Sequence, residues 1–176
     1  MNVSNRLAFY SKSRDVDPGR GTQERVDDLR RYYELAKFPN WRRTLSNFHV
    51  APFLFDGMTY NSIEHVFQAK KIELADPIKA HAFTIESSSE IGLGDGSVAQ
   101  RNRKLVQLDK VLLATWNQMS QDVMARAAVC KFAQCPAARD VLLATRDAEL
   151  WHIVSRKSPV RFVHLEHIRD NHTSLI

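Results

Sequence analysis

Residues 45–70 read LSNFHVAPFLFDGMTYNSIEHVFQAK, and the spacing of the apolar residues changes inside this stretch. In its first part, aromatic and β-favouring residues flank Asp56-Gly57, a dipeptide typical of two-residue hairpin turns. This pattern predicts two short antiparallel strands. In its second part, Asn61 is placed to cap a helix over 62–74. The apolar face of that helix consists of Ile63, Val66, Phe67 and Leu74.

Helical signals dominate the rest of the chain. A turn-rich segment over 14–21 precedes Thr22, which we expect to cap a helix over 23–37 that is stopped by Pro39. Asp76-Pro77 opens another helix, and 87–97 has the composition of a loop. Further helices are expected over 98–118, 121–134 and 136–145, whereas 160–168 fits a strand or a helix. We therefore predict the α+β class: a single compact, helix-rich domain over 1–176 with a small antiparallel β element.

The charged residues indicate what kind of binding partner to expect. Lys plus Arg is 25 and Asp plus Glu is 20, for a net charge of +5. This favours an anionic partner such as a nucleic acid, a nucleotide or a phosphorylated metabolite. The basic residues are scattered, and most are expected on solvated faces. No stripe of Arg, Lys and Asn follows one helix face, which weakens the alternative of a DNA-binding domain.

Targeting signals and cysteines point to the cytoplasm. The N-terminal residues lack the apolar core of a signal peptide, and no apolar run is long enough to span a membrane. Cys130 and Cys135 are too few for a zinc site and do not form a secreted framework, so we expect reduced thiols. His164 and His167 lack a third ligand at a known spacing. We expect no metal, no cofactor and no membrane association, and the oligomeric state stays open.

Some polar residues of the expected helices have two interpretations. At 100° per residue, Glu64, Gln68 and Lys71 share a stripe beside the apolar face of helix 62–74, where they can line a pocket. Alternatively, Glu64 at the third helical position after Asn61 completes a capping box. Lys131 either meets a partner or ligand, or extends along apolar surface to reach water.

For Trp116 and for the glycine-rich segment 92–96, a structural role is favoured over a role in binding. Trp116 aligns with leucines on one helical face, which favours the core over a stacking platform. The glycines of GLGDG, 92–96, would cradle a phosphate only between a strand and a helix, and no such unit surrounds them.

Several short motifs, taken in their order along the chain, carry more specific information than any single residue. They include Leu45-Ser46-Asn47-Phe48, Pro52-Phe53, Asp56-Gly57, Tyr60 and the run from Ser62 to Lys70. This combination resembles the YbiA-like, or NADAR, family. Later matches are Val123-Met124, Lys131-Phe132 and Leu142-Leu143-x-Thr145-x-Asp147-x-x-Leu150. Near the start, Phe9-Tyr10-Ser11-Lys12-Ser13 and Pro18-Gly19-x-Gly21 are similar to the N-terminal motif of a subset of members, so the resemblance covers about 6–155.

The resemblance implies a helix-rich α+β fold and an N-glycosidase that cleaves the bond between C1 of a ribose and a nitrogen. Two substrate classes go with the family: ADP-ribose attached to guanine of nucleic acid, and phosphoribosylamino-pyrimidine intermediates of riboflavin synthesis. The N-terminal motif favours the first. A module that binds ADP-ribose or a nucleotide without turnover is the alternative from another class.

The resemblance also gives the matched residues roles. Glu64 is the first candidate to stabilise the positive charge that develops on the ribose and to orient water. Asp147 is a second acid that protonates the leaving nitrogen or binds ribose hydroxyls, and Lys12 either contacts phosphate or attacks C1 as an unprotonated amine. The residues expected to contact the substrate are Tyr10, Gly19, Gly21, Asn47, Phe48, Tyr60, Gln68, Lys70, Trp116 and Lys131.

One segment departs from the family pattern. Many relatives carry a Trp-Gly-x-Gly stretch after the Thr-x-Asp segment, and this chain has WHIVSRKSP at 151–159 in its place. If that stretch shapes the base side of the pocket, the missing glycines affect the identity of the substrate more than hydrolysis itself.

Overall fold

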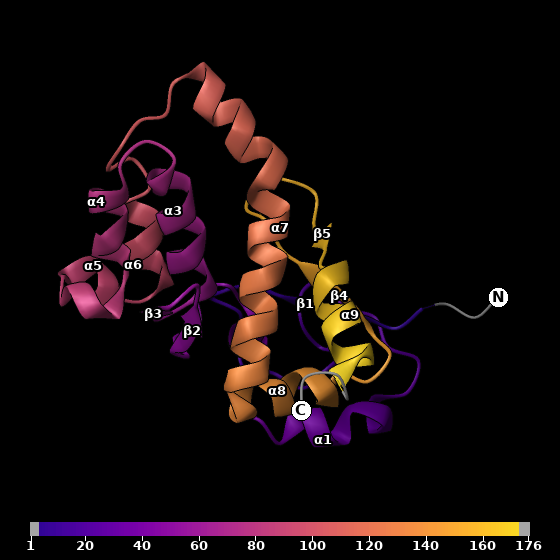
Figure 1. The fold of residues 1–176 in the computed structure, drawn as a ribbon. Coiled ribbons are helices and arrows are strands. Elements are labelled where there is room, and N and C mark those ends of the chain that lie inside the picture. The colour runs from indigo at the N-terminus through magenta and orange to yellow at the C-terminus, as the bar shows by residue number, and fades with distance from the viewer. Residues whose placement is uncertain (1–3, 173–176) are drawn as a thin grey trace. The chain divides into compact units, whose positions relative to one another are not determined.

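The computed structural model describes residues 4–172 and divides the chain into two compact units. The terminal unit combines Met1–Ser46 with Pro136–Ile176, and the central unit is Asn47–Cys135. Both contain helices and strands (Figure 1). The predicted α+β class is therefore confirmed, while the single domain over 1–176 stays a prediction.

The terminal unit is built on a small sheet that the sequence patterns did not predict. Strands β1 (Arg6–Phe9) and β4 (Glu149–His152) pair in parallel, and β5 (Val160–Arg161) adds to β4 antiparallel. Leu7, Phe9 and Leu150 are fully buried. Helix α9 (Val163–Asp170) packs against β4 (Figure 1). The segment 160–168 is thus a strand followed by a helix.

The helix expected over 23–37 is wrong. Residues 22–28 form a loop, followed by a 3-10 turn η1 (Leu29–Tyr32) and the short helix α1 (Tyr33–Ala36). Asp28, not Thr22, provides the N-terminal cap. The physical reason is Glu24, whose carboxylate turns into the protein and binds backbone amides of its own loop. The other helices of this unit are α2 (Trp41–Leu45) and α8 (Pro136–Ala144), which pack together.

The central unit contains the predicted hairpin and the helix after it. Strands β2 (Phe53–Phe55) and β3 (Met58–Tyr60) pair antiparallel, and the turn residues Asp56 and Gly57 have φ of 48° and 82°. Positive φ at both positions is what a type I′ turn requires, so Asp-Gly suits it. Helix α3 (Ile63–Glu73) follows and packs against the long helix α7 (Lys110–Gln134).

The region between these helices differs from the prediction. Pro77 opens α4 (Pro77–Ala80) as expected, with Asp76 as its cap. The predicted loop 87–97 instead contains α5 (Glu90–Leu93) and the start of α6 (Gly96–Arg101), after the 3-10 turns η2 (His81–Phe83) and η3 (Ile85–Ser87). The predicted helices 98–118 and 121–134 are also wrong. Residues after α6 form turns up to the cap Asp109, and α7 continues through Met119-Ser120, where the sequence has no Pro or Gly to interrupt it.

Between residues 4 and 172, none of the helices combines the length and apolar character needed to cross a bilayer.

Candidate active site

Glu64 lies in the first turn of α3, with only 8% of its surface exposed. The cap of this helix is Ser62, whose hydroxyl accepts from the His65 backbone N–H at 3.3 Å. Glu64 is therefore the second helical residue. The capping box with Asn61 is wrong, because both Asn and Ser are good caps and the helix begins one residue later. The carboxylate points instead to Gln68, one turn further along.

Two neighbours hold Glu64 in place. Gln68 Nε2 donates to Glu64 Oε1 at 2.7 Å, and the Glu64 backbone N–H donates to the Asn47 carbonyl at 3.0 Å. The Asn47 side chain is itself oriented, since its Nδ2 donates to Met124 Sδ on α7 at 3.2 Å. Asn47, Glu64 and Gln68, predicted from sequence as site residues, thus come together within the central unit.

The environment of Glu64 disfavours its charge. Burial raises the pKa of the carboxyl group above its ordinary value of 4.5. The hydrogen bond from Gln68 and the positive charges of Arg103 and Lys71 lower that pKa and offset part of the effect. The result is a carboxylate that gains from any positive charge brought next to it.

Side-chain amide oxygens of the two residues hydrogen-bonded to Glu64 are unsatisfied. Over residues 4–172, no hydrogen-bond donor reaches the buried Gln68 Oε1 or Asn47 Oδ1. Buried polar atoms nearly always have a partner, because leaving one unpaired costs about 1–3 kcal/mol. These oxygens are suited to accept hydrogen bonds from a ligand.

A residue of this region that the sequence did not single out is His65, which is fully buried. Its Nδ1 lies 2.7 Å from Ser62 Oγ, and its Nε2 lies 2.9 Å from the Ile91 carbonyl on α5. Since a carbonyl only accepts, Nε2 carries the proton and Nδ1 accepts from Ser62. His65 therefore fixes the start of α3, and with it the backbone of Glu64. A histidine next to the predicted catalytic residue was the available signal.

The aromatic candidates of the central unit have structural contacts. Trp116 is 4% exposed and packs edge-on against Phe67, with ring centroids 4.8 Å apart. Tyr60 is 5% exposed and packs edge-on against Phe55. Phe48 is half-buried, and its carbonyl accepts from the Gly96 N–H at 3.2 Å. A Cβ on Gly96 would lie 2.3 Å from Phe48 Cα, so only glycine permits this approach.

The two candidate lysines of this unit differ in their surroundings. Lys70 Nζ is 3.1 Å from both Asp56 and Glu73, so a phosphate would compete with two carboxylates. Lys131 is fully buried, which rules out the interpretation that it reaches water. Burial lowers the pKa of Lys131 to about 7, and burial together with the charge of Lys131 lowers the pKa of His49 to about 4.

A cavity of the central unit, of about 330 Å³, is lined by the β2–β3 hairpin and α7. Asp56 contributes to its wall and pairs with Arg126 at 3.1 Å. No residue predicted from the sequence to touch substrate is among the described residues that line this cavity.

In the terminal unit, Gly19 and Gly21 serve a buried carboxylate of the protein itself. Their amides each donate to Glu24 Oε2 at 2.9 Å, and Arg42 pairs with the same oxygen at 2.7 Å. Gly19 has φ of +85°, and a Cβ there would lie 2.4 Å from Val26 Cγ2. The backbone amides of these two residues, both predicted to contact substrate, are thus engaged by Glu24 in this structure.

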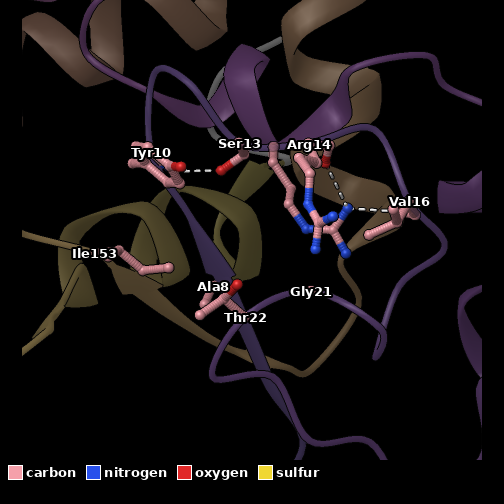
Figure 2. Close-up of a pocket in the computed structure, with 9 residues that line it drawn as sticks. Ala8, Tyr10, Ser13, Arg14, Val16, Gly21, Thr22 and Ile153 are labelled. Atoms are coloured by element: carbon pink, nitrogen blue, oxygen red, sulfur yellow. Dashed lines mark hydrogen bonds between the residues drawn. The ribbon is translucent and has the colours of Figure 1, made fainter.

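Tyr10 and Gly21 line a small pocket of about 40 Å³ in the terminal unit. Figure 2 shows Tyr10, Ser13 and Arg14 around it, with the Tyr10 backbone N–H donating to Ser13 Oγ at 2.9 Å. This volume holds a few water molecules. Lys12 is exposed and is not part of the lining.

The remaining candidates of the terminal unit lie on its surface. Asp147 is exposed and forms an ion pair with Arg31 at 2.5 Å. The segment 151–159 begins as the end of β4 and continues as a loop toward β5. Among the residues with assigned structure, no cluster of three or more His, Cys, Asp or Glu side chains could hold a metal ion.

Comparison with known proteins defines the fold class first. The NMR structure of the E. coli protein YbiA superposes with a TM-score of 0.57 at 21% sequence identity, covering 99% of this chain and 88% of that one. The two proteins therefore share a helix-rich α+β fold.

Sequence comparison then defines the family. The NADAR domain matches residues 31–158, so the chain belongs to the NADAR domain family. Curated relatives include N-glycosidase YbiA of Shigella flexneri and of Shigella boydii, each 34% identical over 105 residues. The matched region spans 60% of this chain and 59% of each relative.

Proposed function

We propose that this protein is an N-glycoside hydrolase that releases ADP-ribose from guanine bases, with Glu64 as the catalytic carboxylate. The observation that carries the proposal is the buried Glu64 carboxylate at the start of α3, which accepts one hydrogen bond from the part of the chain that the structure describes. Support also comes from the NADAR domain and from relatives named N-glycosidase. The basic chain suits a substrate that carries a diphosphate.

The chemistry follows from the charge that Glu64 can stabilise. As the bond between C1 and nitrogen breaks, its electron pair leaves with guanine, and positive charge develops on the ribose. A carboxylate that is poorly solvated in the free protein gains most from this charge, because the interaction is strongest in a site of low dielectric. Water then adds to C1, its proton passes to Glu64, and the guanine nitrogen takes up a proton.

Asp147 and Lys12 keep the roles predicted for them as part of this proposal. An acid such as Asp147 would protonate the leaving nitrogen, although it first has to exchange its ion pair with Arg31. Lys12 is exposed and can contact a phosphate. The cytoplasmic location and the independence of metals and cofactors also stay predictions.

The test uses single-stranded DNA that is ADP-ribosylated on guanine, with release of ADP-ribose followed by mass spectrometry. We expect release by the parent protein and a rate about 10³-fold lower for Glu64→Gln, which keeps the shape of the side chain but not its charge. Glu90→Gln, which changes an exposed glutamate of α5 in the same unit, is the matched control and should keep full activity.

A separate arm offers a phosphoribosylamino-pyrimidine. If the protein cleaves only that compound, the substrate is the pyrimidine metabolite and not ADP-ribosylated guanine. Binding of ADP-ribose without cleavage of either compound would identify a binding module.

A further inference from the structure

Three side-chain oxygens of the Glu64 region in the central unit are hydrogen-bond acceptors, while the positive charges that act on Glu64 come from Arg103 and Lys71. Glu64 Oε2, Gln68 Oε1 and Asn47 Oδ1 can each receive a hydrogen bond, and the two amide oxygens are buried without a donor from the described part of the chain. The amide nitrogens that belong to them are already engaged by Glu64 and by Met124 Sδ. The fixed nitrogens determine which way each amide points, so its oxygen cannot turn away.

This pattern selects the part of the substrate that binds here. Phosphate oxygens would be repelled by a carboxylate and by two carbonyl oxygens, whereas hydroxyl groups donate to all three. In a ribosyl N-glycoside, the hydroxyls nearest to C1 are those at the 2- and 3-positions of the same sugar. A carboxylate beneath C1 therefore places its hydrogen-bonded neighbour Gln68 close to these hydroxyls.

We infer that Gln68 Oε1 and Asn47 Oδ1 accept hydrogen bonds from the 2- and 3-hydroxyls of the ribose that carries the scissile bond. The inference rests on the proposed function for its choice of sugar, but it concerns recognition and not turnover. Its consequence is specificity for ribosyl over 2-deoxyribosyl N-glycosides. The protein can then cleave a ribosyl adduct on DNA without cleaving the deoxyribosyl bonds of the DNA itself.

The test measures binding by calorimetry with three probes: ADP-ribose and its two analogues that lack the 2- or the 3-hydroxyl on the sugar distal to adenine. We expect the parent to bind each deoxy analogue about 10- to 100-fold more weakly than ADP-ribose, because a buried acceptor stays unpaired. In Gln68→Met or Asn47→Leu, ADP-ribose binding should fall toward that of an analogue. Discrimination against the missing hydroxyl should then shrink in at least one variant.

Gln100→Met, which changes an exposed glutamine of the same unit, is the control and should bind all three probes as the parent does. Circular dichroism and thermal melting check that each variant is folded. Equal binding of the three probes by the parent, or full discrimination in both variants, would overturn the inference.

Turnover separates this inference from the proposed function. If the parent discriminates between the probes but releases no ADP-ribose from modified DNA, the proposed function fails and the hydroxyl contacts stand. If it releases ADP-ribose and its 2- and 3-deoxy counterparts at equal rates, and binds the probes equally, the hydroxyl contacts fail and the proposed function stands.

Discussion

Both units of this protein contain a glutamate whose side chain is shielded from water, and Glu24 and Glu64 differ sharply in the hydrogen bonds they receive. In the terminal unit, Glu24 accepts five hydrogen bonds: from the Ala8, Gly19 and Gly21 amides, and from Nε and Nη2 of Arg42. In the central unit, Glu64 accepts a single bond from Gln68 within the described residues. Both carboxylates are shielded from water, so the difference lies in what the protein supplies to them.

The comparison separates an acid whose negative charge the protein balances from one whose charge it balances only in part. Glu24 has its negative charge balanced by Arg42, which also donates to the carbonyls of Val16 and Asp17, so nothing is left for a ligand to satisfy. The negative charge of Glu64 is balanced only in part by its neighbours. Removing Glu24 should therefore damage the fold, and removing Glu64 should damage only turnover.

The largest expected effect on stability is that of Glu24→Gln. The substitution leaves the Arg42 guanidinium buried without its counter-charge, which costs about 3–5 kcal/mol of unfolding free energy. Urea denaturation followed by circular dichroism measures it. Glu34→Gln removes an exposed partner of Lys37 and should leave the midpoint unchanged. Equal midpoints for both variants would show that Glu24 is not structural.

Gly19 and Gly57 provide a matched pair of glycines, one in each unit. Both have positive φ, at +85° and +82°, but a Cβ on Gly57 meets open space while one on Gly19 meets Val26, as judged over the described residues. Gly57→Ala should cost about 1–2 kcal/mol of backbone strain, and Gly19→Ala about 2–4 kcal/mol because a clash is added. Urea midpoints of the two variants test the order. The reverse order would mean that the Glu24 loop adapts at little cost.

Substitution of Ser62 tests whether the cap of α3 contributes more to stability than an ordinary helix cap. Ser62→Ala removes the cap and the partner of the buried His65 Nδ1, and should lower the unfolding free energy by about 1–2 kcal/mol. Asp109→Ala removes the exposed cap of α7 and should lower it by about 1 kcal/mol. If thermal melts show the same loss for both, the His65 bond adds no stability.

The smallest effect expected is a gain in stability from Glu64→Gln. Burial raises the folded-state pKa of Glu64 above 4.5, so the folded protein is penalised once this group ionises. Below the unfolded-state pKa, the parent and the variant should unfold at the same temperature. As the pH rises through the raised folded-state pKa, the parent loses this contribution and the variant should melt progressively higher. A constant difference at all pH values would contradict this origin.

The sequence predicted the parts of the fold that depend on neighbouring residues. Asp56-Gly57 requires only its own backbone angles, and α3 follows from an apolar period within one segment. The pairing of β1 with β4 is not local, and strands of four residues carry too little alternation to be distinguished from loops. The expected helix over 23–37 failed because Glu24 gains more from five donors than from a helical first turn.

For the candidate site, the sequence predicted which residues come together. It did not predict which of their polar atoms would have hydrogen-bond partners. The motif around Glu64 identified Asn47 and Gln68 as its companions, and the structure places all three together. That Gln68 points its nitrogen toward Glu64, and keeps its oxygen unpaired, depends on packing from α7 and on the one-residue shift of the cap to Ser62. Neither appears in the spacing of residues along the chain.

The order in which the two units fold during synthesis follows from the pairing of β1 with β4. The central unit is one continuous segment, so it can complete its contacts as soon as α7 has left the ribosome. The terminal unit has to wait, because β1 is made early and its partner strand arrives only after the entire central unit. During that interval the apolar residues of β1 lack the strand against which they are buried in the folded protein.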